Sequence, residues 1–525
     1  MAAITIDIDE LAGLSKIPKE EIEDLLTIIG IPIESSQDNK LELEITPNRP
    51  DLLSVEGLAR ACRAYKFFIH PQYKAENKEI NIIVNKNVAT IRPYIGGVYI
   101  EGLEMDEKFL DSLIQLQEKL HNTIGRKRKK MAIGIHDIEN ATAPFRYFAA
   151  KPDEIKFKPL GFDREMTLGQ ILKEHPKGIE YAHLIKDSCP ILADKKGNVL
   201  SFPPIINGEF SKLKIGSKKI FIDCTGTDQA TINTSLNILS CAFADRGWKV
   251  YQIKVNSKIY EVFKAKKIKF NANFTNKVLG IKLSIEQQRK LLLKFGHEMK
   301  GNFVFVPPYR ADVFGQIDLV EDIAIAYGYN NFKPTKPQFY SEPKINDEFE
   351  FLAELLIGLG FFEVSSWILT NQNTLKKAAI TNALKVSNPL TEEFSTLRPA
   401  LYPNILEIFS KSKSAKMPQK IFEIGPIIEP TTLKQKTNCC FAIAQPKANF
   451  NQIHSYLKGI LNELNLEYKL EEKDHPIFIP GRSAIILSNQ KDIGFIGEVH
   501  PDILENFSIE QPVALVEINL ENLNK

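Results

Sequence analysis

The stretch Pro307–Asn330, PPYRADVFGQIDLVEDIAIAYGYN, sets four acids within eleven residues of otherwise apolar sequence. These acids are Asp312, Asp318, Glu321 and Asp322. The last three stand at i, i+3 and i+4, so on a helix they share one face. The first precedes them across Gly315, where the chain can fold back. Converging carboxylates repel one another unless a hard cation neutralises them, and Mg²⁺ takes oxygen ligands. The stretch therefore predicts a helix that begins at a magnesium site.

The same acids also admit a second interpretation. Asp318-x-x-Glu321 matches a capping box, and acids in a first turn suit the helix dipole. A cap uses two of the acids and leaves two unexplained. The sequence supplies metal ligands without showing that they converge, so both interpretations stay open.

Length and composition limit the classes of protein. A chain of 525 residues predicts three or four domains, and 43% apolar with 25% charged residues is typical of a soluble globular protein. A net charge of +2 leaves nucleic-acid contacts to local patches. Six cysteines without a C-x-x-C pair fit a reducing compartment. With no signal-peptide pattern and no membrane-length apolar run, we expect a cytoplasmic protein that has no membrane partner.

Alternating and helical patterns succeed one another along the chain, which predicts an α+β multidomain fold. A linker with three prolines, KPTKPQFYSEPK (Lys333–Lys344), separates the last two segments. The expected domains are an N-terminal α+β domain (1–78), an α+β module (79–261), a helical module ending in the acidic helix (262–335) and a domain of helices and strands (340–525).

Two local patterns in the first domain make specific predictions. KLELEI predicts a strand with Leu41, Leu43 and Ile45 on one face. Pro50 forbids regular structure in the turn that follows, and Asp51 is the expected N-cap of the next helix.

Polar residues in the second segment indicate a pocket or a strand edge. In IFIDCTGTD, Asp223 and Thr225 should face one side of a strand and Cys224 the other. SFPPIING, from Ser201, is a turn-rich element that a pocket could use. His136, in GIHD, is either a general base or a structural residue at a strand end.

Basic residues stand out in three places. GRKRKK (Gly125–Lys130) is either a solvated helix end, which the helix dipole favours, or a contact for a phosphate backbone. Arg398 and Arg482 belong to SNPLTEEFSTLRPAL and HPIFIPGRSAII. A surface position is the default for both arginines, since a buried arginine needs a carboxylate or phosphate partner.

Several familiar motifs are absent. The sequence has no G-x-x-x-x-G-K-[ST] or G-x-G-x-x-G loop, no G-x-S-x-G elbow and no metal-type Cys/His spacing. The usual loops that bind phosphate through their backbone are therefore missing.

Taken in order, six stretches resemble one family over nearly the whole chain. They are TPNRPDLLSVEGLAR, GRKRKKMAIGIHD, SFPPIING with KKIFIDCTGTD, PPYRADVFGQIDLVEDIAIAYGYNNF, SNPLTEEFSTLRPAL, and IPGRSA with IGFIGEVHP. The set is similar to the β subunit of phenylalanyl-tRNA synthetase in its short archaeal and eukaryotic-cytosolic form.

The resemblance implies a function, partners and a metal. The chain would be a subunit of an α₂β₂ ligase that joins phenylalanine to tRNA(Phe) with ATP. It would bind Mg²⁺ at the α–β boundary, because its four acids, Asp312, Asp318, Glu321 and Asp322, match the family pattern D-x5-D-x2-E-D.

The resemblance also assigns roles to the domains. The helical module would be winged-helix-like, and 340–525 would be a class II synthetase-like antiparallel sheet with helices. That domain would have no catalytic residues for aminoacylation and no nucleotide site, because these lie on the α subunit. The second segment would be an editing module that hydrolyses Tyr-tRNA in a pocket lined by Ser201, Asp223 and Thr225 with His136 nearby.

Two other functions compete with this one. A free-standing hydrolase of mischarged tRNA would need neither the acid cluster nor a synthetase-like C-terminal segment. A nucleic-acid-binding or scaffold protein built on residues 262–332 is disfavoured by the near-zero net charge and by the acidic helix.

Overall fold

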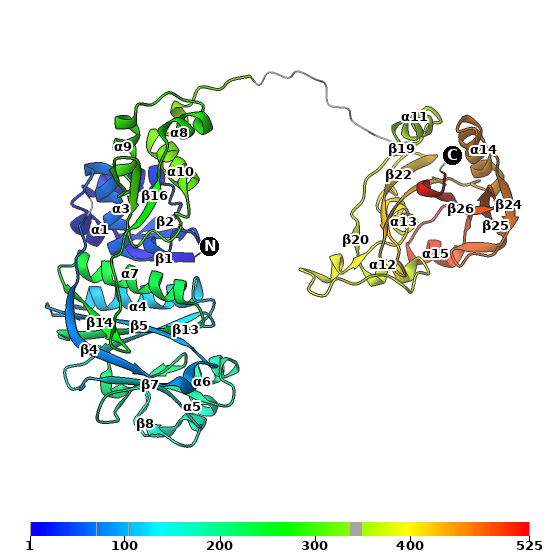
Figure 1. The fold of residues 1–525 in the computed structure, drawn as a ribbon. Coiled ribbons are helices and arrows are strands. Elements are labelled where there is room, and N and C mark those ends of the chain that lie inside the picture. Colours follow the sequence, from blue (N-terminus) through cyan, green and yellow to red (C-terminus); the bar gives the residue numbers. More distant parts are fainter. Residues whose placement is uncertain (1, 70, 103, 337–348, 524–525) are drawn as a thin grey trace. The chain divides into compact units, whose positions relative to one another are not determined.

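The chain folds into two compact units, residues 1–336 and 337–525, in a computed structural model. The structure describes residues 2–69, 71–102, 104–336 and 349–523 (Figure 1). The expected linker Lys333–Lys344 lies outside the described residues from position 337 onward. The mixture of helices and strands confirms the α+β multidomain prediction.

The first unit begins with a small sheet in the order β1-β3-β2. Its elements are β1 (Ala2–Asp7), β2 (Ile33–Gln37), β3 (Lys40–Ile45), α1 (Ile8–Ser15), α2 (Ile22–Ile29) and α3 (Val55–Phe67). As predicted, β3 buries Leu41, Leu43 and Ile45 on one face.

The N-cap expected at Asp51 is wrong. Helix α3 starts at Val55, and its N-cap is Ser54, which accepts the backbone N–H of Gly57. Asp51 lies in a short 3₁₀ turn and is buried against Arg49, which bonds both of its carboxylate oxygens at 2.9 Å. The Pro50 ring starts this extra turn, and the turn delays the helix.

A ten-stranded sheet forms the centre of the first unit, in the order β12-β11-β10-β7-β4-β14-β5-β13-β6 with β15 beside β14. Its strands are β4 (Glu76–Val84), β5 (Tyr94–Glu101), β6 (Met131–Asp137), β7 (Phe145–Ala150), β10 (Cys189–Ala193), β11 (Val199–Phe202), β12 (Ile206–Asn207), β13 (Lys219–Gly226), β14 (Lys249–Val255) and β15 (Lys258–Ile259). Strand β4 runs parallel to β14 and β7, and the other pairs are antiparallel.

Helices cover one face of this sheet. Helices α4 (Glu107–Asn122) and α7 (Gln229–Asp245) lie along it (Figure 1) and share a core with alternate residues of β5, β6 and β13. On the opposite face, residues of β4, β5, β13 and β14 share a second core with β7, β10 and β11 of the same sheet. A small β8–β9 pair (Lys156–Phe157, Met166–Thr167) with α5 (Leu168–Glu174) and α6 (Pro176–Tyr181) completes the segment.

The helical module carries a three-stranded sheet in the order β16-β18-β17. Its elements are β16 (Lys266–Lys269), α8 (Ala272–Leu279), α9 (Ile285–Leu293), β17 (Glu298–Lys300), β18 (Phe303–Val306) and α10 (Gln316–Tyr327). Phe295, Tyr309 and Ala326 of this module belong to the same core as the N-terminal segment. The three expected N-terminal domains thus pack as one unit.

The second unit is built on a seven-stranded sheet in the order β19-β22-β23-β27-β26-β25-β24. Its strands are β19 (Phe362–Glu363), β22 (Gln419–Ile428), β23 (Gln435–Ala444), β24 (Lys469–Glu472), β25 (Phe478–Ser488), β26 (Lys491–Val499) and β27 (Val513–Asn519), with a separate pair β20 (Leu369–Thr370) and β21 (Thr396–Leu397). Helices α11 (Glu350–Gly358) and α14 (Phe450–Glu463) share one core with it, and α13 (Tyr402–Lys411) and α15 (Pro501–Asn506) share the other, where α12 (Gln372–Lys377) packs on α13. The sheet is antiparallel except for β19 with β22.

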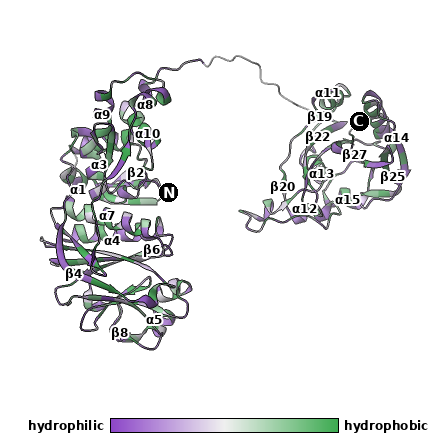
Figure 2. Cartoon of the chain, viewed as in Figure 1, coloured by the Kyte–Doolittle hydropathy of each residue, from purple (hydrophilic) through white to green (hydrophobic). Residues whose placement is uncertain are grey.

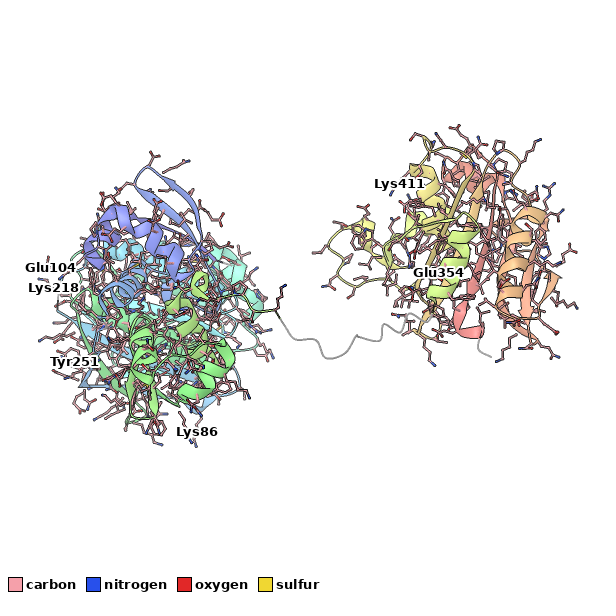
Figure 3. All side chains as sticks on the ribbon, turned by 90° about the horizontal axis from the view of Figure 1, so that it is seen from above. Lys86, Glu104, Lys218, Tyr251, Glu354 and Lys411 are labelled. Carbon is pink, nitrogen blue, oxygen red and sulfur yellow. The ribbon has the colours of Figure 1, made fainter. Side chains whose placement is uncertain are left out.

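Polar and apolar residues are interleaved along the elements of both units (Figure 2). Among the described helices, none has the length and apolar character to cross a bilayer. Charged pairs such as Lys218–Glu104, at 2.6 Å, lie on the surface (Figure 3).

Candidate functional site

A cavity of about 170 Å³ lies in the first unit and is lined by residues from both ends of the ten-stranded sheet, β6 on one side and β11 and β12 on the other. Its walls come from α4, β6, β13, the start of α6 and the segment 201–207. Two of the four residues predicted for a pocket, Ser201 and Asp223, line it. Thr225 and His136 lie behind the wall. The alternation predicted for β13 is confirmed, since Cys224 belongs to the core on the helical side.

Asp223 is held by a buried chain of polar side chains. Its Oδ1 lies 2.7 Å from Nε2 of His136, and Nδ1 of that histidine lies 2.9 Å from Oγ of Ser211. Ser211 Oγ also bonds the carbonyl of Leu200 at 3.3 Å. All three side chains are buried. The histidine is thus fixed from both ring nitrogens, and it orients the carboxylate toward the cavity.

The hydrogen-bonded series Ser211–His136–Asp223 has the residue types of a hydrolytic Ser-His-Asp triad, but its orientation toward the cavity is reversed. In a triad the serine meets the substrate and the carboxylate lies behind the histidine. Here Asp223 lines the cavity and Ser211 lies behind His136. Ser211 therefore supports the site and is not its nucleophile. Nothing in the sequence around Ser211 indicated this role.

Glycine at position 134 keeps the cavity open beside the carboxylate. A Cβ at Gly134 would collide with the carboxylate of Asp223 and the ring of His136. These atoms belong to a buried, bonded pair that has no room to move away. A side chain here would displace the pair or fill the cavity.

Thr225 supports the site from outside. Its Oγ1 accepts from Nε of Arg92 at 2.9 Å, and its carbonyl accepts from Nη2 of the same arginine at 2.8 Å. Burial lowers the pKa of Arg92. Tyr147 donates its hydroxyl to the carbonyl of Arg92 at 2.9 Å. The threonine thus fixes the end of β13, next to the cavity.

Arg128 forms a positively charged part of the wall. Its Nη1 donates to the carbonyls of Pro204 and Ile205 at 3.1 and 2.9 Å, and its Nη2 donates to Glu118 at 2.8 Å. The guanidinium stacks on Tyr181, 4.6 Å from the ring centre. Arg128 therefore ties helix α4 to the segment that follows β11.

Glu118 and His121 complete this wall from α4. Nε2 of His121 accepts the backbone N–H of Ile133 at 2.8 Å, so its other nitrogen, Nδ1, faces Glu118 as a donor at 3.3 Å. The hydrogen bond from His121, aided by Arg128, lowers the pKa of Glu118 to about 2. Burial lowers the pKa of His121. At neutral pH the wall therefore carries a carboxylate, a neutral imidazole and a guanidinium.

Two buried polar atoms of lining residues lack a hydrogen-bond partner in the described part of the chain. They are Oγ of Ser201 and Nε of Arg128. An unsatisfied buried polar group costs about 1–3 kcal/mol. Such atoms in a cavity wall indicate a polar ligand that supplies the missing bonds.

The cavity suits an aromatic ring that bears a hydroxyl. An apolar cavity of roughly 150 Å³ is large enough for benzene, and this one measures about 170 Å³. Oδ2 of Asp223 has no partner among the described groups and can accept a hydrogen bond from a ligand. A ring without a donor would leave Oδ2 unpaired, which disfavours that ring.

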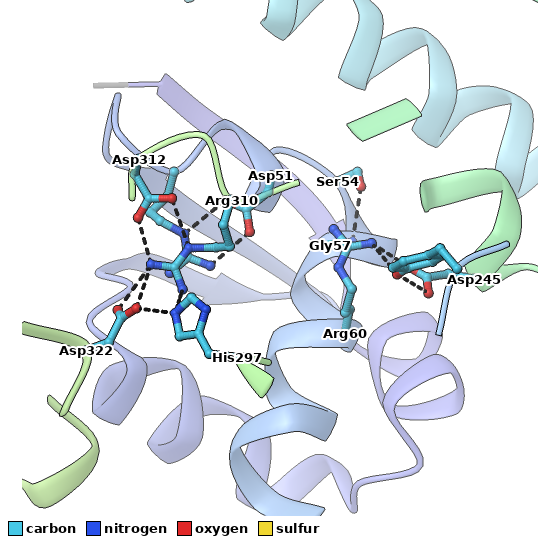
Figure 4. Close-up of polar contacts among 11 residues, drawn as sticks. Asp51, Ser54, Gly57, Arg60, Asp245, His297, Arg310, Asp312 and Asp322 are labelled. Atoms are coloured by element: carbon cyan, nitrogen blue, oxygen red, sulfur yellow. Dashed lines mark hydrogen bonds and ion pairs between the residues drawn. The ribbon is translucent and has the colours of Figure 1, made fainter. Parts of the chain in front are cut away.

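The acid cluster of the helical module is organised differently (Figure 4). Arg310 is buried and binds both oxygens of Asp312, at 2.9 and 2.7 Å. It also binds both oxygens of Asp322, at 3.1 and 2.9 Å. His297 Nε2 lies 2.7 Å from the second of these aspartates. Burial alone would raise the pKa of Asp322, but Arg310 and His297 outweigh it and lower the pKa to about 2.

The predicted Asp318–Glu321 capping box is wrong. Helix α10 begins at Gln316, so Asp318 is already its third residue. Oδ2 of Asp318 accepts the backbone N–H groups of Phe314 and Gly315, both at 2.8 Å. The aspartate caps the helix from inside, and Glu321 lies exposed one turn later.

The four acids line one cavity of about 640 Å³, together with residues 44–50 of the N-terminal segment. Within the described ranges no three His, Cys, Asp or Glu side chains are placed to hold a metal ion. A four-carboxylate site does not fit, since Arg310 already neutralises two acids. The second oxygen of Asp318 and the exposed Glu321 fit a smaller site, because Mg²⁺ usually keeps several waters and takes one or two carboxylates.

The two arginines of the second unit have protein partners. Arg398 is buried, which corrects its expected surface position, and binds Glu423 at 2.7 Å, Ser366 at 2.8 Å and the carbonyl of Pro426 at 2.9 Å. Arg482 is exposed and pairs with Glu498 at 2.6 Å.

Comparison with known proteins agrees with the resemblance in the sequence. The family model for the phenylalanyl tRNA synthetase beta chain CLM domain matches residues 333–520, and that for the tRNA synthetase B5 domain matches residues 268–329. The phenylalanine–tRNA ligase beta subunit of Methanocaldococcus jannaschii is 39% identical over 99% of this chain and 100% of the relative. That of Archaeoglobus fulgidus is 38% identical over 99% of this chain and 98% of the relative.

A solved structure is similar to the first unit. The N-terminal fragment of the phenylalanyl-tRNA synthetase beta subunit from Pyrococcus horikoshii aligns over 62% of this chain and all of the fragment, with a TM-score of 0.59 and 34% identity. Identity above 30% over nearly the full length of several relatives shows the family. The chain belongs to the phenylalanine–tRNA ligase beta subunits, which are subunits of an aminoacyl-tRNA synthetase.

Proposed function

We propose that this subunit assembles with an α subunit into an α₂β₂ ligase that uses ATP to join phenylalanine to tRNA(Phe), and that the cavity of the first unit hydrolyses tyrosine wrongly joined to that tRNA. The observation that carries the second part is the free oxygen of Asp223 at the wall of a ring-sized cavity. Tyrosine has the hydroxyl that this oxygen can bind, and phenylalanine lacks it.

The need for such a second site follows from the energetics of specificity. A hydrophobic pocket built for phenylalanine rejects a ring with one added hydroxyl only weakly. A site that hydrogen-bonds the hydroxyl rejects the ring without it by a factor of about 10⁴–10⁵, because its polar groups would be left unpaired. A cavity selective for tyrosine therefore removes the error and spares the correct product.

The hydrolysis needs positioning more than a nucleophilic side chain. Water attacks the ester carbonyl carbon, the bond to the ribose oxygen breaks, and that oxygen takes up a proton, which releases tyrosine and intact tRNA. Asp223 holds the ring, and His136 and Ser211 hold Asp223. Ser201 supplies an unpartnered hydroxyl toward the ester or its water. Thr225 keeps the strand in place.

Deacylation of Tyr-tRNA by the assembled enzyme tests this proposal. We expect Ser201→Ala and Asp223→Ala to slow hydrolysis strongly, while Thr225→Val slows it less because it acts through strand position. Phe-tRNA synthesis should stay near the parental rate in all three. Parental hydrolysis in both cavity variants would place the editing site elsewhere.

We also propose that Asp318 and Glu321 bind Mg²⁺ through oxygen ligands and water at the boundary with the α subunit. Asp312 and Asp322 then contribute by holding Arg310. Two of the four predicted acids thus bind the ion, and the other two form the ion pairs with Arg310 beside it.

For the second unit we propose a class II synthetase-like sheet without a catalytic site of its own, and for the helical module a winged-helix-like fold. The buried Arg398 is held by Glu423, Ser366 and the carbonyl of Pro426, which gives it a structural role within this unit. We expect no phenylalanine-dependent pyrophosphate exchange from this chain alone, and robust exchange would refute the assignment. The complex would work in the cytoplasm, where its six buried cysteines stay reduced.

A further inference from the structure

The basic run Gly125–Lys130 forms a turn that is held in an unusual conformation. Three consecutive residues, Arg126, Lys127 and Arg128, have φ values of 49°, 51° and 63°. The left-handed region disfavours side chains by about 1–2 kcal/mol per residue. Three such residues in a row persist only where the surrounding structure fixes them.

Backbone bonds on both sides fix this turn. The N–H of Arg128 donates to His121 at the end of α4 at 3.2 Å, and that of Lys130 donates to Gly125 at 2.9 Å. Thr227, just after β13, donates to the carbonyl of Lys130 at 2.9 Å. A Cβ at Gly125 would lie 2.7 Å from the carbonyl oxygen of His121, so glycine is required there. The turn is therefore a built element and not a frayed helix end.

The turn sorts its cations into two groups. Arg128 points inward and lines the cavity, while Arg126, Lys127 and Lys129 are exposed. None of these three exposed cations pairs with an acid in the described part of the chain, whereas Lys130 lies 3.6 Å from Asp228. Three unpaired cations thus lie on the same turn as a guanidinium of the cavity wall.

The cavity wall supplies an independent sign of a ligand. Nε of Arg128 is buried without a partner, and so is Oγ of Ser201. The inner wall is acidic at Asp223 and Glu118, so a purely anionic ligand would be repelled there. Cations outside and carboxylates inside fit a ligand that is anionic along its length and offers hydrogen-bond donors at its tip.

We propose that the turn Gly125–Lys130 binds the phosphate groups of the 3′ strand of an RNA whose aminoacylated end lies in the cavity. This rests on the proposed deacylation and assigns the residues that hold the RNA for it. Arg126, Lys127 and Lys129 contact successive phosphates, and Arg128 fastens the turn to the cavity wall. An oligonucleotide strand carries the evenly spaced negative charge that such a cluster attracts.

The test compares two triple variants in the assembled enzyme. One is Arg126→Gln/Lys127→Gln/Lys129→Gln. The other, Lys277→Gln/Lys282→Gln/Lys290→Gln, removes the same charge from exposed lysines of the helical module that likewise have no acid partner among the described residues. Deacylation of Tyr-tRNA is measured from 50 to 200 mM salt, and tyrosyl-adenosine, which lacks the strand phosphates, serves as the comparison substrate.

We expect the turn variant to raise KM for Tyr-tRNA about tenfold and to make its salt dependence shallower by about two in slope, since each single-strand contact contributes roughly 0.7. The variant and the parent should differ little on tyrosyl-adenosine. The control triple should match the parent on both substrates. Equal KM and equal salt slope for the turn variant and the parent would make the run a solvated helix end and overturn the proposal.

Two further outcomes are informative. If an acidic peptide inhibits deacylation as well as an RNA 3′ strand does, the turn binds a protein and the proposal fails. If the parent does not deacylate Tyr-tRNA at all, the proposed function fails, and binding of a fluorescent RNA acceptor hairpin decides about the turn. Unchanged hairpin binding in the turn variant then overturns the RNA assignment, and weakened binding supports it.

Discussion

Two buried histidine–aspartate pairs of equal length differ in what surrounds them. His136–Asp223 and His297–Asp322 are each 2.7 Å apart, and both histidines are fully buried. Arg310 binds both oxygens of the second aspartate, so that pair is closed to a ligand although Asp322 also lines a cavity. The first aspartate has no such cation and faces a cavity. A carboxylate is therefore available to a ligand only where its neighbours leave an oxygen unbonded.

The largest expected effect is a loss of unfolding free energy when Arg310 is removed from the His297–Asp322 pair. Arg310→Met leaves the buried Asp322 and the half-buried Asp312 without their guanidinium partner, and removing one member of a buried ion pair costs about 3–5 kcal/mol. Denaturant unfolding, followed by hydrogen exchange in α10, should show that loss. A change below 1 kcal/mol would mean that solvent reaches the acids.

The next largest expected effect is a loss of Tyr-tRNA deacylation when a methyl group is added beside the His136–Asp223 pair. In Gly134→Ala the new methyl group collides with Asp223 and His136. A displacement of about 1 Å in a positioned site can reduce the rate about 10²-fold, and we expect that loss in Tyr-tRNA deacylation. Gly13→Ala, at a position with open space around the new methyl group and no left-handed backbone, is the matched control for a glycine replacement. Parental deacylation in Gly134→Ala would contradict the geometry of the wall.

Acid should lower the unfolding free energy by a smaller amount, through protonation of Asp322 in the His297–Asp322 pair. The pKa of Asp322 is lowered from 3.8 to about 2, so its stabilising effect is complete above pH 4 and is lost as the pH falls through 2. The shift corresponds to about 2 kcal/mol of unfolding free energy. Asp322→Asn should remove this part of the pH dependence between pH 2 and 5. Identical curves for the variant and the parent would show that the aspartate does not titrate there.

The smallest effect on stability should come from Asp318→Asn. The asparagine oxygen can still accept the N–H groups of Phe314 and Gly315, so the unfolding free energy should change by no more than about 0.5 kcal/mol. If this carboxylate binds Mg²⁺, the α–β complex should dissociate at about tenfold lower EDTA than the parental complex. Superimposable EDTA curves would leave Asp318 with the cap alone.

Patterns of local order were predictable from the sequence, and contacts across the chain were not. Leu41, Leu43 and Ile45 share a buried face because strand alternation is a local property. The same rule placed Asp223 on the cavity side of β13. The partnership of His136 with Ser211 joins residues 75 positions apart, and no local pattern reports it.

The acid cluster shows the same limit. Its four acids are recognisable by their spacing, but their neutralisation depends on the burial of Arg310, which no spacing rule indicates. The start of α10 was misplaced because Asp318 caps the helix through backbone groups that precede it.

Replacing Asp223 and Asp322 by asparagine, one at a time, tests most directly whether only the first aspartate is available to a ligand. For both variants, Asp223→Asn and Asp322→Asn, Tyr-tRNA deacylation is measured in the assembled enzyme. The free energy of unfolding is measured for both in the isolated chain. Our expectation is that the first variant loses deacylation by about a hundredfold or more, the size of effect that loss of one positioned group can have, with little change in the free energy of unfolding. The second should lose stability and keep deacylation in the folded fraction. Equal deacylation by the parent and Asp223→Asn, or a loss of deacylation in Asp322→Asn alone, would contradict it.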